Sequence, residues 1–192
     1  MPLNYVNEKV ILITALEEGK EEDKLVKFSE WELGSEEKVI KAFYDYFKDK
    51  VYKLRSERLE EIVGKGKSER LFITGYNVLV YDIPLLIQKG VEYKVDSIGS
   101  LNELWYSNYI LDLYQVMIHV NRMKFSGLKL GEIKKRFSLN LPALKGSGSK
   151  VPKYYKKKDY GKIEEYAISK LNLLKELRKR LHKDPYLGVK EP

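Results

Sequence analysis

The chain has 192 residues, of which 43% are hydrophobic, and a formal net charge of +8, so we expect one folded domain over residues 1–192 and exclude a disordered chain. It contains no cysteine, which excludes disulfides, thiolate zinc sites and a cysteine nucleophile. No apolar run approaches the roughly 18 residues of a membrane span and no secretory leader is visible, so a cytoplasmic protein without a membrane partner is expected.

The predicted elements alternate between strands and helices. A β-branched run over residues 9–14 predicts a buried strand, and the rough alternation over 24–32 predicts a second strand. Ser35, followed by two glutamates, is typical of a helix start, and apolar residues at helical spacing continue this helix to about residue 63, with a break allowed near Asp49. The order of these elements favours an α/β fold.

The second half of the chain continues the same alternation. Glycine, proline and polar clusters predict loops at 64–69 and, longer and basic, at about 141–161, where we expect a flexible segment. The remaining expected elements are a strand at 71–74, a helix at 82–88 that Gly90 ends, a strand at 107–114, a short helix at 131–137 and a long helix at 162–182.

Positive charge is concentrated toward the C-terminal end. Residues 1–114 have a net charge of −5, whereas residues 115–192 have +13, which indicates that one face contacts a polyanion. Lysines neutralise phosphates and tyrosine rings stack on unpaired bases, so their interleaving predicts contact with single strands or ends of nucleic acid. The alternative is a solvated surface loop. The interleaved residues are Lys150, Lys153, Tyr154, Tyr155, Lys156, Lys157, Lys158 and Tyr160.

Segment 75–84, GYNVLVYDIP, resembles the second motif of the DEDD-type 3′–5′ exonucleases, and most of all that of the proofreading domains of family B DNA polymerases. The matching positions are Gly75, Tyr76, Asn77, Asp82 and Pro84. The alternative is an ordinary strand–turn–helix with a chance aspartate. The resemblance implies an RNase H-like fold, in which helices flank a mixed β-sheet, and a strand at 9–14 in the centre of that sheet.

The resemblance also implies two further motifs. The Asp-x-Glu motif at the end of the first strand aligns with Ala15 and Glu17, and the Tyr-x-x-x-Asp motif of the last helix aligns with Tyr166 and Lys170. Such enzymes hold two divalent metals with carboxylates, and here two of those carboxylates are absent. Glu17 and Asp82 could hold at most one metal weakly, so we expect no cofactor and no intact catalytic set.

The resemblance therefore predicts a catalytically degenerate exonuclease-like protein that binds nucleic acid, DNA more than RNA, in DNA replication or repair. Two alternatives stay open. The first is an active enzyme that uses Mg²⁺ or Mn²⁺ with unusual ligands, such as Asp159. The second is a scaffold subunit bound to a replication or repair protein. Ala15 could also be an engineered residue, and the abundance of lysine and glutamate indicates a thermophilic source. We expect Lys170 to replace the metal charge by pairing with Asp82, Glu17 or both.

Overall fold

Contacts within the chain define two compact units, and each is described by itself. The first comprises residues 1–13 and 26–111, and the second comprises residues 14–25 and 112–192. The expectation of a single domain over residues 1–192 stays a prediction. The computed structural model describes residues 8–19, 21–61, 70–137 and 140–183, so the expected loop at 64–69 lies outside the described residues.

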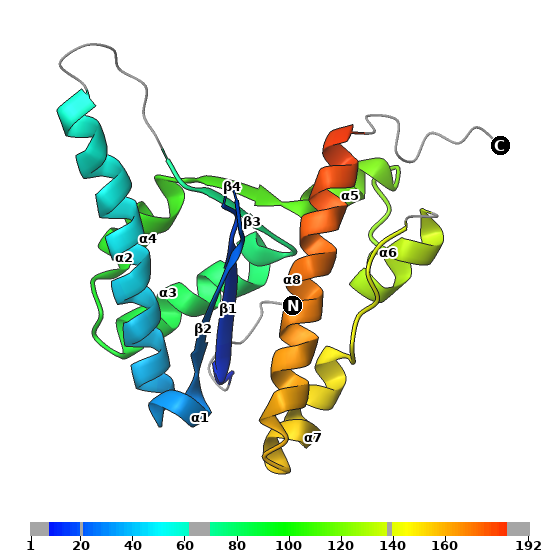
Figure 1. Ribbon diagram of the computed structural model, residues 1–192, viewed down its shortest axis with the longest axis horizontal. Coiled ribbons are helices and arrows are strands. Elements are labelled where there is room, and N and C mark those ends of the chain that lie inside the picture. The colour runs from blue at the N-terminus through cyan, green and yellow to red at the C-terminus, as the bar shows by residue number, and fades with distance from the viewer. Residues whose placement is uncertain (1–7, 20, 62–69, 138–139, 184–192) are drawn as a thin grey trace. The chain divides into compact units, whose positions relative to one another are not determined.

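The described elements alternate as expected (Figure 1). In chain order they are β1 (Leu12–Glu17), β2 (Lys24–Ser29), α1 (Glu30–Leu33), α2 (Glu36–Glu61), β3 (Phe72–Gly75), the π-helix η2 (Val78–Asp82), α3 (Ile83–Glu92), α4 (Ile98–Tyr106), β4 (Tyr109–Asp112), α5 (Leu113–Val120), α6 (Leu130–Arg136), the 3₁₀-helix η3 (Gly148–Lys150), α7 (Val151–Lys156) and α8 (Tyr160–Lys183).

The α/β class is confirmed, but the strands form two small sheets. Among the described residues β1 pairs only with β2 and β3 pairs only with β4, so β1 is not the central strand of one mixed sheet. The expected second strand was too long at its C-terminal end. The chain leaves β2 at Ser29 and makes the single helical turn α1, which Gly34 ends in the left-handed conformation at φ 91°.

Aromatic packing forms the core of the first unit, where α2 lies against α3 and α3 lies against α4. Trp105 packs on Phe47 with ring centroids 4.5 Å apart and donates its indole N–H to the Tyr44 hydroxyl at 3.2 Å. Burial raises the pKa of Tyr44 to about 12. Helix α2 passes Asp49 without a break. The other buried side chains of this core include Val39, Ile40, Phe43, Val51, Leu101 and Leu104.

Several elements differ from the sequence prediction, among them the strand expected at 107–114, which is shorter as β4 and gives way to α5 at Leu113. Helix α4 was not expected, although Ser97 caps it through a hydrogen bond from the Ser100 amide. Gly90 was expected to end the helix at 82–88, but α3 continues through it to Glu92. Its role is packing instead, because a Cβ at Gly90 would lie 2.7 Å from Leu101 and 2.9 Å from the Tyr44 ring.

A buried carboxylate links three segments of the first unit. Glu36, only 9% exposed, accepts hydrogen bonds from the Val10 amide at 2.6 Å and the Tyr93 hydroxyl at 2.8 Å. The ammonium of Lys89, a residue 4% exposed, lies 3.5 Å from Glu36 and 3.0 Å from Glu92. Burial and the bond to Glu36 raise the pKa of Tyr93 well above its usual value. This buried charge is satisfied by three partners, as a buried carboxylate must be.

Helices dominate the second unit. The expected helices at 131–137 and 162–182 are confirmed as α6 and α8, each within two residues of the expected bounds. Helix α7 packs on α8 (Figure 1). Among the described residues, no helix combines the length and the apolar character that crossing a membrane requires. Buried apolar side chains of this unit include Leu113, Met117, Ile118, Ile133, Leu141, Ile163, Leu173, Leu174 and Leu177.

Candidate nucleic-acid interface and remnant site

Backbone geometry accounts for several residues of segment 75–84. A Cβ at Gly75 would lie 2.1 Å from a methyl group of Val78, so only glycine fits this close approach. Asn77 has φ 62°, a left-handed conformation that asparagine tolerates, and its carbonyl accepts from the Tyr81 amide at 3.0 Å. Tyr76 is 9% exposed and is part of the buried apolar set. The Gly-Tyr-Asn triplet therefore builds the junction between β3 and η2.

Asp82 is the last residue of η2 and immediately precedes α3, with Pro84 in the first turn of that helix. Its half-buried carboxylate does not cap α3, since no side-chain cap bond forms there. A π-helical turn inside or beside an α-helix is frequent at functional sites. Asp82 therefore stands at the start of α3 without capping that helix.

The first strand ends where the sequence predicted its site residues. Glu17 is the last residue of β1, and Ala15 precedes it by two positions. Because alternate residues of a strand share a face, Ala15 and Glu17 point to the same side of β1. Both are half-buried. This is the arrangement in which two carboxylates could share a metal, but here one position has only a methyl group.

Tyr166 and Lys170 lie one turn apart on α8, so they share a face of that helix. Both are half-buried. Tyr166 and Lys170 belong to the second unit, as do Ala15 and Glu17. Asn77 and Asp82 belong to the first unit. The expected convergence of Asp82 with Glu17, and the pairing of Lys170 with either acid, stay predictions.

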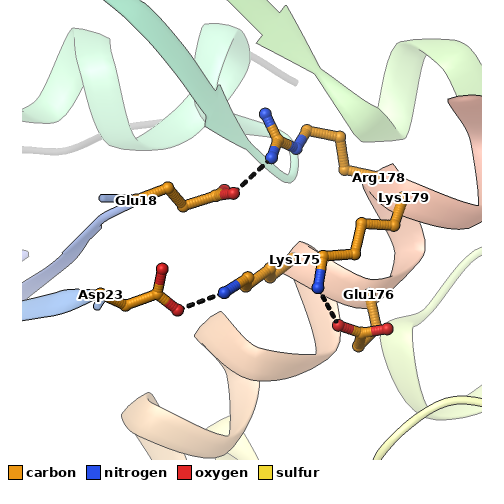
Figure 2. A network of polar contacts seen from close by, with 6 residues as sticks. All are labelled: Glu18, Asp23, Lys175, Glu176, Arg178 and Lys179. Carbon is orange, nitrogen blue, oxygen red and sulfur yellow. Dashed lines mark hydrogen bonds and ion pairs between the residues drawn. The ribbon is translucent and has the colours of Figure 1, made fainter. Parts of the chain in front are cut away.

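Two ion pairs join the turn after β1 to α8 (Figure 2). The Glu18 carboxylate contacts the Arg178 guanidinium at 2.5 Å, and Asp23 pairs with Lys175. The hydrogen bond to Asp23 raises the pKa of the Lys175 amine above its usual value. Because the partners are 160 and 152 residues apart, no local sequence signal could have found this ionic clasp. It attaches the end of the Glu17 strand to the helix that bears Lys170.

We expect reversal of one charge in the clasp to loosen this attachment. Arg178→Glu places two acids together, so the amides of the 18–23 turn should exchange hydrogen faster, and the effect should shrink in high salt because both side chains are partly exposed. Glu18→Arg added to that variant should restore slow exchange. Hydrogen–deuterium exchange measures both, and unchanged exchange in Arg178→Glu would contradict the clasp.

The basic segment at 141–161 is not the loop that its composition predicted. Residues 148–156 are helical, as η3 and α7, and α8 begins at Tyr160. Val151, Tyr154 and Tyr155 recur at helical spacing and are half-buried. The loop prediction was wrong for these residues because glycine, serine and lysine content outweighed that short apolar pattern.

Helix α7 ends in a closed turn. Lys158 has φ 57°, and its amide donates to the Tyr155 carbonyl at 3.0 Å. The Asp159 amide donates to the Tyr154 carbonyl, also at 3.0 Å. This pair of bonds is a Schellman motif, which terminates a helix with a residue in the left-handed conformation. The basic lysines therefore lie on a defined helix end.

Most lysines of this segment keep their charge uncompensated. Of the seven lysines in residues 145–162, two are paired, Lys145 with Glu165 at 2.8 Å and Lys162 with Asp159. The other five have no ion pair among the residues that the structure describes, and all five are exposed. They form the basic surface of α7, made of Lys150, Lys153, Lys156, Lys157 and Lys158. Such a surface attracts an anion because no acid of the described residues pairs with it.

A family model described as the RNase_H superfamily matches residues 3–170. The chain belongs to the RNase_H superfamily. No curated protein and no solved structure gave a significant match. Membership in the RNase_H superfamily confirms the fold family and indicates a nuclease-like, nucleic-acid-related function.

The RNase_H superfamily match extends from before β1 to Lys170, and so includes the six positions that the sequence aligned with exonuclease motifs: Ala15, Glu17, Asn77, Asp82, Tyr166 and Lys170. Within the described residues, no group of three or more histidine, cysteine, aspartate or glutamate side chains is placed to hold a metal ion.

Proposed function

We propose that this member of the RNase_H superfamily binds nucleic acid without cleaving it, DNA in preference to RNA, as a component of DNA replication or repair. The observation that carries the proposal is the pair of residues Ala15 and Lys170. Ala15 shares a strand face with Glu17, and Lys170 shares a helix face with Tyr166. A metal pair needs oxygen ligands on both elements, and neither residue supplies one.

The residues present do not fit the metal pair of a two-metal nuclease. An alanine methyl has no lone pair, and a lysine ammonium repels a cation from the position where a carboxylate would hold it. Glu17 and Asp82 are the acids left at the aligned positions. Lys170 would supply a positive charge to them in place of the metal, by an ammonium with three hydrogen-bond donors.

Nucleic-acid binding is supported by a separate feature. The basic surface of α7 presents five lysines that are unpaired among the described residues, in a superfamily that acts on nucleic acid. Binding to phosphates needs accessible positive charge, and it does not need a metal. Loss of the metal ligands is therefore compatible with retained binding.

Restoring the two carboxylates tests the proposal. The unmodified protein should show no millimolar-range Mg²⁺ or Mn²⁺ binding by calorimetry and no cleavage of single-stranded DNA. Ala15→Asp combined with Lys170→Asp should create metal binding and weak 3′–5′ cleavage, because two oxygen ligands return and the competing ammonium is removed. The single variant Ala15→Asp is the matched control, since it keeps the ammonium.

One result would overturn the proposal. It is metal-dependent cleavage by the unmodified protein that persists through purification and disappears in Asp82→Ala. That outcome would favour the active enzyme, with Asp159 or another acid as the missing ligand. An absence of any DNA or RNA binding at low salt would favour the scaffold subunit instead.

A further inference from the structure

The tyrosines of the basic segment face the protein rather than solvent. Tyr154, Tyr155 and Tyr160 are half-buried, whereas the five lysines of the basic surface are exposed. Stacking on a base requires an open ring face. The sequence alone treats the two residue types as one mixed surface, and the structure separates them by exposure.

The ring faces already have partners within the second unit. Tyr155 and Tyr160 pack on each other with centroids 6.2 Å apart and planes tilted by 56°. The Lys162 ammonium lies 5.6 Å from the centroid of the Tyr154 ring and also pairs with Asp159. These contacts pack the start of α8 against α7, so the tyrosine rings lie where the two helices meet.

Tyr166 lies beside the segment that leads into α7. A Cβ at Gly146, which has φ 118°, would lie 3.7 Å from Tyr166, and a Cβ at Gly148 would lie 3.5 Å from its hydroxyl. One turn along α8, the Ser169 hydroxyl accepts from the Lys145 amide at 3.0 Å. The segment that leads into α7 therefore rests on α8, which holds the lysines in place.

We propose that the basic surface of α7 recognises the sugar-phosphate backbone alone, without reading or stacking on bases. The inference rests on the proposed function and names its ligand more closely: a chain of regularly spaced phosphates, single- or double-stranded. Lysines supply point charges to phosphate oxygens, and such contacts contain no sequence information. The tyrosines are positioning residues that hold the helix from which the lysines project.

A strand without bases provides the test. Fluorescence anisotropy at low salt would compare a labelled oligothymidine with an abasic strand of equal phosphate number. Backbone recognition predicts dissociation constants within about twofold of each other. Stacking would instead make the abasic strand at least about fivefold weaker, because each stacked base contributes about 1–3 kcal/mol. That result would overturn the inference and leave the proposed function intact.

Ring variants separate positioning from contact. Tyr155→Leu should lower the melting temperature of the protein and leave the affinity for oligothymidine within about twofold when measured well below that temperature. Tyr155→Phe, which keeps the ring, should also leave the affinity for oligothymidine unchanged. A loss of affinity in folded Tyr155→Leu that appears with oligothymidine and not with the abasic strand would overturn the inference. No binding of either strand by the unmodified protein would overturn both this inference and the proposed function.

Discussion

Replacing Lys153, Lys156 and Lys157 with alanine should weaken DNA binding by about 100-fold at 50 mM salt, the largest effect on binding that we expect from any surface change. Each lysine that neutralises a phosphate releases a condensed counterion, and loss of three contacts should reduce the salt slope by about two units. The three positions are exposed on or next to α7, where alanine keeps the helix. Lys158 is left in place because it forms the turn that ends α7.

The matched control has the same charge change elsewhere. Lys24, Lys38 and Lys124 are exposed and lie outside the basic surface of α7, so their triple alanine variant also loses three positive charges. If net charge alone drives binding, both triple variants should weaken it equally. We expect the control to change the salt slope by well under one unit. Equal loss in both variants would contradict a localised contact at α7.

The largest effect on stability should come from the buried carboxylate of the first unit. Glu36→Ala should lower the free energy of unfolding by about 3–5 kcal/mol, since it leaves the Val10 amide and the Tyr93 hydroxyl without their acceptor and removes one of the two acids beside Lys89. Urea unfolding followed by tryptophan fluorescence measures this change. Both tryptophans, Trp31 and Trp105, lie in the first unit.

The neighbouring glutamate is a close control. Glu37 is exposed and pairs with Lys41 one turn along α2, an i,i+4 pair on the surface. Exposed pairs of this kind contribute little to stability, so Glu37→Ala should leave the unfolding midpoint nearly unchanged. Glu36→Gln should fall between the two, because its amide oxygen can still accept from Val10. A Glu36→Ala variant as stable as Glu37→Ala would show that these buried bonds do not hold the segments together.

The sequence alone determined the elements whose signals are local. These signals depend only on residues a few positions away in the sequence. They are the periodicity of α2 and α8, the β-branched run of β1, and the glycine and asparagine of segment 75–84. Within segment 75–84, Asn77 lies in the left-handed region, and Gly75 lies against Val78 where a Cβ would not fit. The same local reading found the lysines of the basic surface, since charge is a property of each residue.

The tertiary structure alone decided how these residues are used. Gly90 lies inside α3, where Leu101 and Tyr44 leave no room for a Cβ. The residues next to Gly90 in the sequence do not indicate this close packing. Arg178 meets Glu18 across 160 residues of chain. Segment 148–156 is helical because Tyr154 and Tyr155 pack beside α8, which reverses the preference of a glycine- and lysine-rich composition. Packing between segments that are distant in the sequence determines the role of Gly90, the Arg178 ion pair and the helix at 148–156. A sequence pattern indicates only the local preference of each residue.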